Sequence, residues 1–506
     1  MGARGAGSRA RARERARASF FIVVMFFGVF GLIVFTELLL VQPAAPKSPP
    51  IIGRDRPDYE QFQAEDYLGV RVGTGGKGTK ARRGAFPAPE EKLPPPLATN
   101  TTPPDGMWQP VGGTRYKFLV YSAFYERRIG RVIRLIGATK TRGPEKVWCR
   151  FWYSSNHSTT VPAKVKMIRE NWNLRYSACF VVCPLKRNQT VPLSVSVVSR
   201  PRAAHSNLLR VLQAPNRDPP PDSLVVCVKP LHFTYNRPLQ LMEFVELNTV
   251  LGATHFVMYN HTVGRQAACV LQHYRQQGLL SLLPWQLNML SQKEIRTEGL
   301  FAALNDCLYR SMYHYAFAAL IDLDEFIIPR KEDALPPLLA TLSARSDSRS
   351  AGAFSFQNAF FYLQWKDEPY SAGDPQLSAS LISQRKTRRR QKLHPHKQRS
   401  KYICRPERVL EAGNHFVWEF MSGSGALSVP PDQAILHHYR VCEFGGDDCV
   451  KTPSFIDRTA LKYKEVLSER VERRYSELKE VCSLPDLPPP PSLPSAPPPL
   501  PLSPPV

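Results

Sequence analysis

The chain has 506 residues, a formal net charge of +24 and 47 prolines. Its length allows about three domains, but the prolines gather towards the two ends, which excludes one compact fold over the whole chain. The positive charge favours polyanions, nucleotide phosphates or acidic lipid headgroups as partners.

The amino-terminal region predicts a membrane anchor. Residues 20–41 form an apolar run in which only Thr36 and Glu37 are polar, and six arginines precede it. As a helix this run would span about 33 Å, enough to cross a bilayer. A cleaved signal peptide would have a shorter apolar core of about 7–15 residues, so an uncleaved signal anchor is favoured. The positive-inside rule then leaves residues 1–19 as a cytoplasmic tail and puts the rest of the chain in a lumen.

Two segments are predicted to be disordered. Residues 42–110 are rich in Pro, Gly and charge and are expected to form a stem. Residues 483–506 are Pro-rich and are expected to form a disordered or polyproline-like tail. In a lumen, Asn-x-Ser/Thr sequons can be glycosylated, and we expect this at Asn100, Asn156 and Asn188.

A small β-rich domain is predicted over residues 111–200. This range holds four β-branched or aromatic runs separated by turn residues, at 116–121, 147–153, 177–183 and 191–198. None of these runs carries obvious catalytic chemistry. The polar, Pro-rich residues 201–222 are expected to form a linker.

From residue 223 to residue 482 the pattern changes to alternating strands and helices. Asn236 is placed to cap the first helix, and Gly252 to end it. An alternation of this kind predicts a mostly parallel sheet with flanking helices, joined by right-handed crossovers. The expected strands lie at 224–228, 255–259, 279–285 and 317–321, and the expected helices at 236–252, 264–277 and 296–314.

The most informative stretch follows the fourth of these strands. Asp322 and Asp324 come directly after the apolar residues 317–321. On an extended segment, alternate residues point the same way, so both carboxylates are expected to face one site. Ligands bind at the carboxyl ends of such strands, and two hard oxygen ligands suit Mg²⁺ or Mn²⁺ together with a phosphate-bearing substrate.

Two further features have less specific interpretations. Residues 385–401 contain nine Lys or Arg residues, which favours a solvated, mobile loop; a nucleic-acid patch is the alternative, but a lumen holds no such partner. Of the ten cysteines, the pairs Cys179/Cys183 and Cys442/Cys449 have spacings that zinc could use, yet an oxidising lumen favours disulfides. Cys442–Cys449 is the easiest closure, and Cys227 is expected to be a free thiol in the core.

Five short motifs in order resemble glycosyltransferase family 92. They are EFVE at 243–246, LGATHFVMYN at 251–260, IDLDEFI at 321–327, KYI at 401–403 with Pro406, and LHHYR at 436–440. The resemblance covers residues 225–480. It implies a GT-A type, Rossmann-like catalytic domain that uses a nucleotide sugar, and characterised relatives transfer galactose from UDP-galactose with inversion and Mn²⁺.

The resemblance also suggests roles for individual residues. Asp322 and Asp324 would hold the metal, with His437 or His438 completing its coordination, and Lys401 could contact the donor diphosphate. Inversion needs a carboxylate base to take the acceptor proton, and the sequence leaves four candidates open: Glu325, Glu407, Glu411 and Glu419.

These observations predict a metal-dependent, type II glycosyltransferase of the Golgi membrane. It would move a hexose, with galactose favoured, from a UDP-sugar to a glycan or glycoprotein acceptor. The alternative is a catalytically inactive luminal protein of the same fold that binds a sugar nucleotide or a glycan.

Overall fold

The structure is a computed structural model that describes residues 105–154, 157–215, 217–345, 349–367, 380–442 and 448–487. The predicted cytoplasmic tail, the anchor at 20–41, Asn100, Asn156 and almost all of the stem and the Pro-rich tail lie outside these residues. All of the described residues belong to one compact unit. None of the helices in the described ranges is long and apolar enough to span a membrane.

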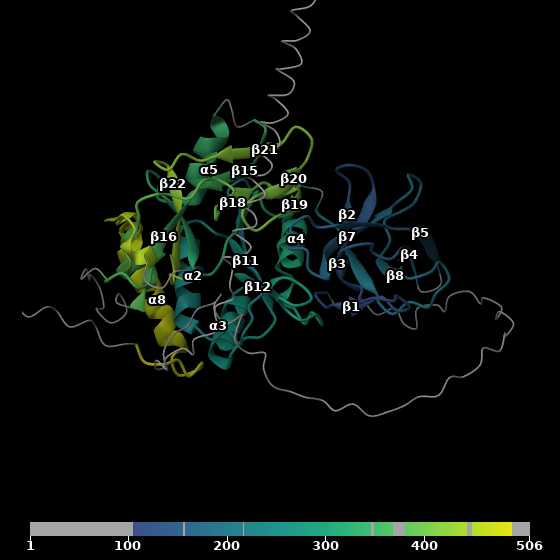
Figure 1. Ribbon diagram of the computed structural model, residues 1–506, viewed down its shortest axis with the longest axis horizontal. Helices are drawn as coiled ribbons and strands as arrows, with labels where there is room; N and C mark the ends of the chain where they lie inside the picture. Colours follow the sequence, from purple (N-terminus) through teal and green to yellow (C-terminus); the bar gives the residue numbers. More distant parts are fainter. Residues whose placement is uncertain are drawn as a thin grey trace, which may run out of the picture. The chain divides into compact units, whose positions relative to one another are not determined.

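The β-rich region predicted from the sequence is one nine-stranded sheet system (Figure 1). Its strand order is β5-β4-β8-β9-β2-β3-β7-β6, and β1 pairs with β2. β9 pairs with both β2 and β8, so the sheet extends into the range predicted to be a linker. The strands are β1 (Gln109–Pro110), β2 (Leu119–Glu126), β3 (Val132–Lys140), β4 (Trp148–Trp152), β5 (Ser158–Pro162), β6 (Lys164–Met167), β7 (Tyr176–Pro184), β8 (Ser194–Val198) and β9 (Leu209–Leu212).

The second region is built on a seven-stranded mixed α/β sheet of order β12-β11-β10-β13-β18-β15-β21. The first four of these strands are parallel, as the sequence predicts, whereas β18 is antiparallel to both of its neighbours. Their bounds are β10 (Leu224–Cys227), β11 (His255–Asn260), β12 (Leu280–Pro284), β13 (Phe317–Leu320), β15 (Ala351–Phe356), β18 (Lys401–Cys404) and β21 (Gly425–Ser428).

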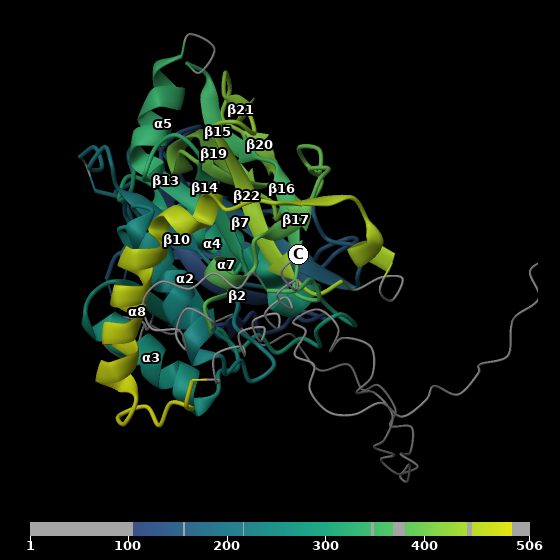
Figure 2. The same ribbon diagram turned by 90° about the vertical axis from the view of Figure 1, so that its left-hand side faces the viewer.

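Helices flank this sheet. α2, α3 and α8 lie together on one side (Figure 2), where Arg470 and Arg474 of α8 form ion pairs with the buried Glu246 of α2. The helices are α2 (Pro238–Val250), α3 (Arg265–Gln276), α4 (Leu300–Ser311), α5 (Leu335–Ala344), α7 (Ile382–Arg385) and α8 (Lys464–Leu478), with short 3₁₀ turns η2 (Thr297–Gly299), η4 (Pro406–Arg408), η5 (Asp448–Lys451) and η6 (Thr459–Tyr463).

The ends of α2 show where local sequence signals hold and where they fail. Gly252 ends the helix as predicted: its φ is +101°, and a Cβ there would lie 2.5 Å from Cδ of Pro336. The predicted cap at Asn236 is wrong, because Arg237 precedes the helix and no side chain caps it. Asn236 instead accepts a hydrogen bond from the backbone N–H of Ala267 at 3.0 Å, so it supports α3.

A smaller sheet of order β14-β22-β16 lies beside the large one. β14 (Glu325–Pro329) is antiparallel and β16 (Asn358–Tyr362) parallel to the central β22 (Ala434–Arg440). The sequence predicts one strand over residues 354–362, but the chain passes at Gln357 from β15 of the large sheet to β16 of the small one. Two more strand pairs complete the region, β17 (Arg388–Arg390) with β23 (Ser454–Ile456) and β19 (Val409–Ala412) with β20 (Val417–Phe420).

The basic segment 385–401 is only partly the solvated loop that its charge predicts. Lys386 and Arg389 are buried, because carboxylates on neighbouring segments pair with them. Lys386 Nζ lies 2.5 Å from Asp367 Oδ1, and Arg389 Nε lies 2.8 Å from Asp457 Oδ2. These cations therefore fix the segment to the fold.

Four disulfides connect the described regions: Cys149–Cys183, Cys227–Cys307, Cys269–Cys482 and Cys442–Cys449. The predicted Cys442–Cys449 pairing is confirmed. The prediction of a free thiol at Cys227 is wrong, because α4 packs across β10 and brings Cys307 to it. Cys179 and Cys404 are buried free thiols.

Candidate functional site

The acids of the sequence motif lie in a turn between β13 and β14. Residues 321–324 connect the two strands, and the backbone N–H of Glu325 donates to the carbonyl of Asp322 at 3.1 Å. The backbone N–H of Tyr439 on β22 donates to the carbonyl of Asp324 at 2.9 Å. The expectation of an extended segment is therefore wrong: a turn positions the carboxylates, and each has its own partners.

Asp322 is held by two ammonium groups. Its Oδ2 lies 3.1 Å from Nζ of Lys229 and 3.2 Å from Nζ of Lys401. Burial alone would raise the pKa of Asp322, but the two lysines outweigh it and hold that pKa well below its usual range. Asp322 is therefore an anion at every physiological pH.

Lys401 is the first residue of β18, next to β13 in the sheet. Its side chain is only 2% exposed. Besides Asp322, its Nζ contacts Oδ1 of Asn414 at 2.9 Å and Oε2 of Glu325 at 3.4 Å. Burial would lower the pKa of Lys401, yet the two carboxylates raise it above the usual value. Asp322, Asp324 and Glu325 are called the acid cluster from here on. The predicted donor-binding lysine thus lies within the acid cluster, where its positive charge balances part of the negative charge of the carboxylates.

The strand register distinguishes between the two candidate histidines. His438 is opposite Glu325 in the β14–β22 pair, with Nε2 3.3 Å from Oδ2 of Asp324 and Nδ1 3.2 Å from Oε1 of Glu325. Burial would raise the pKa of Asp324, but His438 more than offsets it, and that pKa is lowered.

His437 points to the other face of β22, because successive residues of a strand alternate. It is buried and stacks on Phe361 with ring centroids 4.4 Å apart. Burial lowers its pKa to about 3, so it is neutral. The structure brings His438 to Asp324 and Glu325 and leaves His437 in the core.

The structure also places the four candidate bases in different surroundings, and only one of them lies in the acid cluster. Glu325 lies in the acid cluster, is 1% exposed, and accepts a hydrogen bond from the backbone N–H of Asp322 at 3.0 Å; burial raises its pKa. Glu411 and Glu419 form ion pairs with Lys166 and Arg169 of the β-rich region. Glu407 lies on η4, where the neighbouring carbonyls bind Arg128, and burial raises its pKa.

Sequence reasoning missed two residues of this site. Lys229 follows the carboxyl end of β10, so the rule that drew attention to Asp322 could have found it. Glu170 comes from the β-rich region, and its Oε2 accepts hydrogen bonds from the backbone N–H of Asn414 at 3.0 Å and from Nε1 of Trp418 at 3.1 Å. No local pattern marks Glu170, because only the packing of the two regions brings it close to Asn414 and hence to Lys401.

The predicted glycosylation sites can be placed only in part. Asn188 is exposed in the turn between β7 and β8, a position that an attached glycan can occupy without disturbing either strand. Asn100 and Asn156 fall outside the described residues, and their modification stays a prediction.

The parallel strand β13 thus leads to two aspartates with cations around them, at the carboxyl edge of a mixed α/β sheet, which is the edge where sheets of this class bind their ligands. The model of glycosyltransferase family 92 matches residues 222–480, slightly more than half of the chain, and the chain belongs to this family.

Two curated relatives from Caenorhabditis elegans are similar over shorter stretches. Glycosyltransferase family 92 protein F13G3.3 is 30% identical over 122 residues, which are 22% of this chain and 24% of that protein. Beta-1,4-galactosyltransferase galt-1 is 23% identical over 192 residues, 38% of this chain and 41% of that protein. The chain thus spans less than half the length of either relative.

Solved structures show a weaker likeness. Staphylococcus aureus TarS residues 1–349 in complex with UDP gives 11% identity and a TM-score of 0.24, covering 51% of this chain and 73% of that one. Glucosyl-3-phosphoglycerate synthase from Mycobacterium tuberculosis, in complex with Mn²⁺, UDP-glucose and phosphoglyceric acid, gives 12% identity and a TM-score of 0.23, covering 52% and 80%. Scores this low place no constraint on the fold of the present chain.

Proposed function

We propose that this chain transfers a hexose from a UDP-sugar to a glycan or glycoprotein acceptor with inversion, and that the hexose is galactose. The observation that carries the proposal is the acid cluster at the carboxyl edge of the sheet, where Asp322 and Asp324 meet Lys229, Lys401 and His438. Family membership supports the reaction class. The relative named as a beta-1,4-galactosyltransferase supports the choice of galactose.

The side chains around Asp324 fit a divalent metal. Oδ2 of Asp324 and Nε2 of His438 converge at 3.3 Å, and Asp324 keeps 31% of its side-chain surface exposed. The other ring nitrogen of His438 lies 3.2 Å from Glu325, the arrangement with a carboxylate that orients metal-binding histidines. Across the described ranges, no group of three or more His, Cys, Asp or Glu side chains is arranged to hold a metal ion, so donor phosphates and water would supply the remaining ligands.

Asp324 and His438 would therefore hold Mn²⁺ or Mg²⁺, with Asp322 beside them. When bound, the metal would stabilise the negative charge that develops on the leaving diphosphate. The ammonium groups of Lys229 and Lys401 fix the orientation of Asp322 and add positive charge at the same edge. These lysines make the cluster close to neutral before a donor binds, so that an anionic donor is not repelled.

Two carboxylates compete for the role of catalytic base. Glu325 lies in the cluster but is 1% exposed and is tied to Asp322. Glu170 is partly exposed, and its second oxygen, Oε1, accepts no hydrogen bond from the residues described here. A base must reach the acceptor hydroxyl, so accessibility favours Glu170. In this proposal Glu170→Gln lowers kcat with little change in donor KM, whereas Glu325→Gln changes both.

The direct test is a donor and acceptor screen. The purified full chain is incubated with Mn²⁺, each of several UDP-sugars and a panel of glycans. The released UDP is quantified, and the masses of the glycans are measured before and after the reaction. Transfer of galactose supports the proposal in full. Transfer of another hexose overturns only the donor assignment, and an absence of both transfer and donor hydrolysis overturns the proposal.

One observation favours a second function. Oδ2 of Asp322 is already paired with two ammonium groups, which suits a protein that binds a sugar nucleotide or a glycan without turning it over. Calorimetry separates the two functions, because metal-dependent UDP binding without any hydrolysis or transfer would establish the binding protein.

For the location we propose the Golgi membrane, with a single-pass anchor at residues 20–41 and the catalytic region in the lumen. The apolar length of that segment supports an anchor, and the four disulfides suit an oxidising compartment. Protease protection of the carboxyl-terminal region in sealed Golgi vesicles tests this, and digestion without detergent would contradict it.

A further inference from the structure

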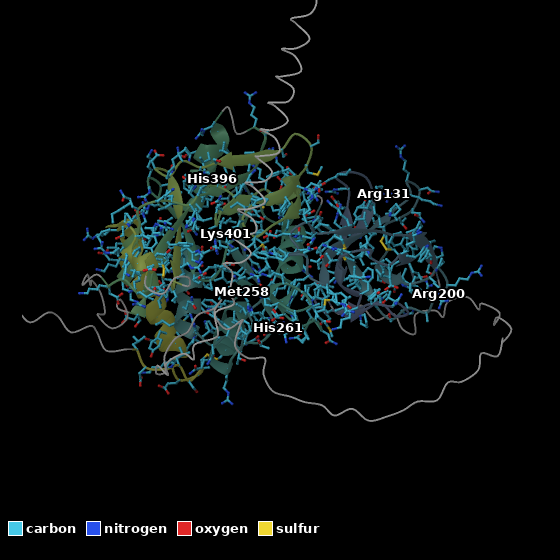
Figure 3. The ribbon with its side chains drawn as sticks, in the orientation of Figure 1. Arg131, Arg200, Met258, His261, His396 and Lys401 are labelled. Atoms are coloured by element: carbon cyan, nitrogen blue, oxygen red, sulfur yellow. A yellow bond between two sulfur atoms is a disulfide. The ribbon has the colours of Figure 1, made fainter. Side chains whose placement is uncertain are left out.

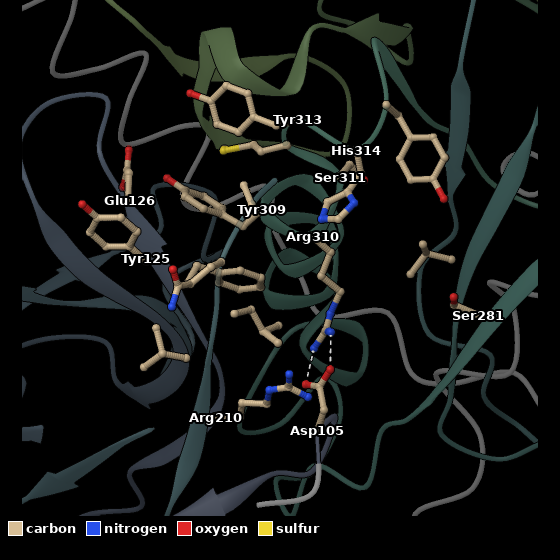
Figure 4. Close-up of a pocket in the computed structure, with 18 of the residues that line it drawn as sticks. Asp105, Tyr125, Glu126, Arg210, Ser281, Tyr309, Arg310, Ser311, Tyr313 and His314 are labelled. Carbon is tan, nitrogen blue, oxygen red and sulfur yellow. Dashed lines mark hydrogen bonds and ion pairs between the residues drawn. The ribbon is translucent and has the colours of Figure 1, made fainter. Parts of the chain in front are cut away.

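A second pocket lies where the β-rich region meets the α/β region. It has a volume of about 590 Å³ and is lined by the end of β2, by β9 and the residues after it, by residues of the strands β11 and β12, and by the end of α4 with the residues after it (Figure 4). This volume falls within the range of about 300–1,000 Å³ that is usual for ligand sites.

This pocket is distinct from the acid cluster because it opens at the opposite edge of the parallel strands. Tyr315 lines the pocket and precedes β13, whereas Asp322 follows β13. Seven residues of nearly extended chain put these two positions about 20 Å apart. His255 also lines the pocket and is the first residue of β11, so the pocket lies at the amino-terminal edge of this strand as well.

The charge of the pocket favours an anion. Four arginines line it, against only two carboxylates, Asp105 and Glu126. Both oxygens of Asp105 bind Arg310, at 2.6 and 2.8 Å. The oxygens of Glu126 bind Arg128 at 2.8 Å and Arg134 at 2.6 Å. The same contacts neutralise Arg310 and Arg128, so the excess positive charge of the lining comes from Arg127 and Arg210.

Tyrosine rings supply part of the remaining surface. Figure 4 shows Tyr125, Tyr309 and Tyr313 along one side of the pocket and Ser281 on the other. Tyr313 has a φ of +62°, in the left-handed region that favours glycine. A tyrosine held in this conformation costs free energy, and such outliers gather at ligand sites. The guanidinium of Arg127 lies 5.2 Å from the centre of the Tyr313 ring, so cation and ring form one surface.

We propose that this pocket is a second saccharide site, which binds an acidic glycan through its sulfate or carboxylate groups. Arginine forks bind such groups in pairs of hydrogen bonds, and tyrosine offers an apolar face to a sugar ring and a hydroxyl to its polar edge. The choice of a saccharide among anions rests on the proposed function. A site about 20 Å from the acids would hold a distant part of the acceptor chain and leave its end free for transfer.

The test is a calorimetric titration of the full chain with a sulfated oligosaccharide, its desulfated counterpart, UDP and inorganic phosphate, each without donor. We compare wild type with Arg127→Gln/Arg210→Gln, two exposed positions in the pocket. Arg200→Gln is the matched control, since Arg200 is exposed on the β-rich region outside the lining (Figure 3). The double variant should bind the sulfated ligand at least tenfold more weakly, and the control should bind as wild type does.

A third variant separates binding from folding. Tyr313→Gly removes the ring but suits the positive φ, which offsets part of the lost packing on the core, so the variant should stay folded in a thermal scan while it binds more weakly. Asp324→Asn, in the other site, should leave the titration unchanged, which makes the result independent of transferase activity. Equal binding of sulfated and desulfated ligands, loss of binding in Asp324→Asn, competition by UDP, or full affinity in the double variant would each overturn the proposal.

Discussion

Two aspartate networks in this molecule have similar partners and opposite exposure. Asp306 of α4 accepts hydrogen bonds from the hydroxyls of Ser122 and Tyr259 and pairs with Arg310 at 2.6 Å, and its side chain is 0% exposed. Asp322 and Asp324 also pair with cations, but their side chains are 13% and 31% exposed.

The difference shows how a buried charge acquires a role. In the Asp306 network, residues from β2, β11 and α4 provide all the partners, so the network holds the β-rich region to the α/β region. In the Asp322–Asp324 cluster, cations balance the acids while part of the surface stays open to a ligand. The same residue type serves stability in a closed network and, in the function proposed above, chemistry in an open one.

The strongest expected effect is at the open cluster. Asp324→Asn removes one anionic metal ligand from a partly exposed turn, so transfer should fall by about 10²–10³-fold, while Tm shifts by less than about 2 °C. Single-turnover assays with saturating Mn²⁺ and thermal unfolding measure the two quantities. Activity close to wild type would place the metal elsewhere.

The matched change in the closed network should do the reverse. Asp306→Asn leaves Arg310 with Asp105 alone, and we expect the free energy of unfolding to fall by about 2–3 kcal/mol. The remaining folded protein should keep its metal dependence and its kcat. Denaturant titration with a parallel activity assay tests this, and a selective loss of kcat at unchanged stability would contradict the distinction.

The two lysines of the open cluster should differ in their effect on stability. Lys401 is 2% exposed with three partners, whereas Lys229 is 12% exposed. Lys401→Met should therefore lower the free energy of unfolding by about 1–3 kcal/mol, and Lys229→Met by less. If urea titrations gave equal losses of unfolding free energy for the two variants, the exposed fraction of each lysine would not determine how much its ion pairs stabilise the fold.

Asp457 provides a pH test of a third, structural network. Burial would raise its pKa, but Thr459, Arg389 and Arg330 together hold the pKa well below its usual range. Because the unfolded state then binds more protons, this stabilisation is present at neutral pH and is lost as pH falls below about 4. In Asp457→Asn the free energy of unfolding should fall by at least about 1 kcal/mol less between pH 5 and pH 3 than it does in the wild type. Equal falls in the two proteins would contradict the inference that Asp457 is stabilised as an anion in the folded state.

The sequence alone determined the features that depend on local pattern. Apolar runs and helical spacing predicted the strands β10 to β13 and the helices between them, and the rule for parallel strands put Asp322 and Asp324 at the carboxyl edge of the sheet. Gly252 ended its helix as predicted, because its positive φ is a local requirement.

Tertiary structure decided everything that depends on register and on distant partners. The pairing of β14 with β22 chose His438 over His437, since a shift of one residue exchanges the two faces of a strand. Packing of α4 on β10 joined Cys227 to Cys307, and α3 drew Asn236 away from its expected cap. Lys229 reached Asp322 from another strand, and Glu170 reached Asn414, a partner of Lys401, from the β-rich region. Contacts of this kind arise between residues far apart in sequence, so no short sequence pattern can predict them.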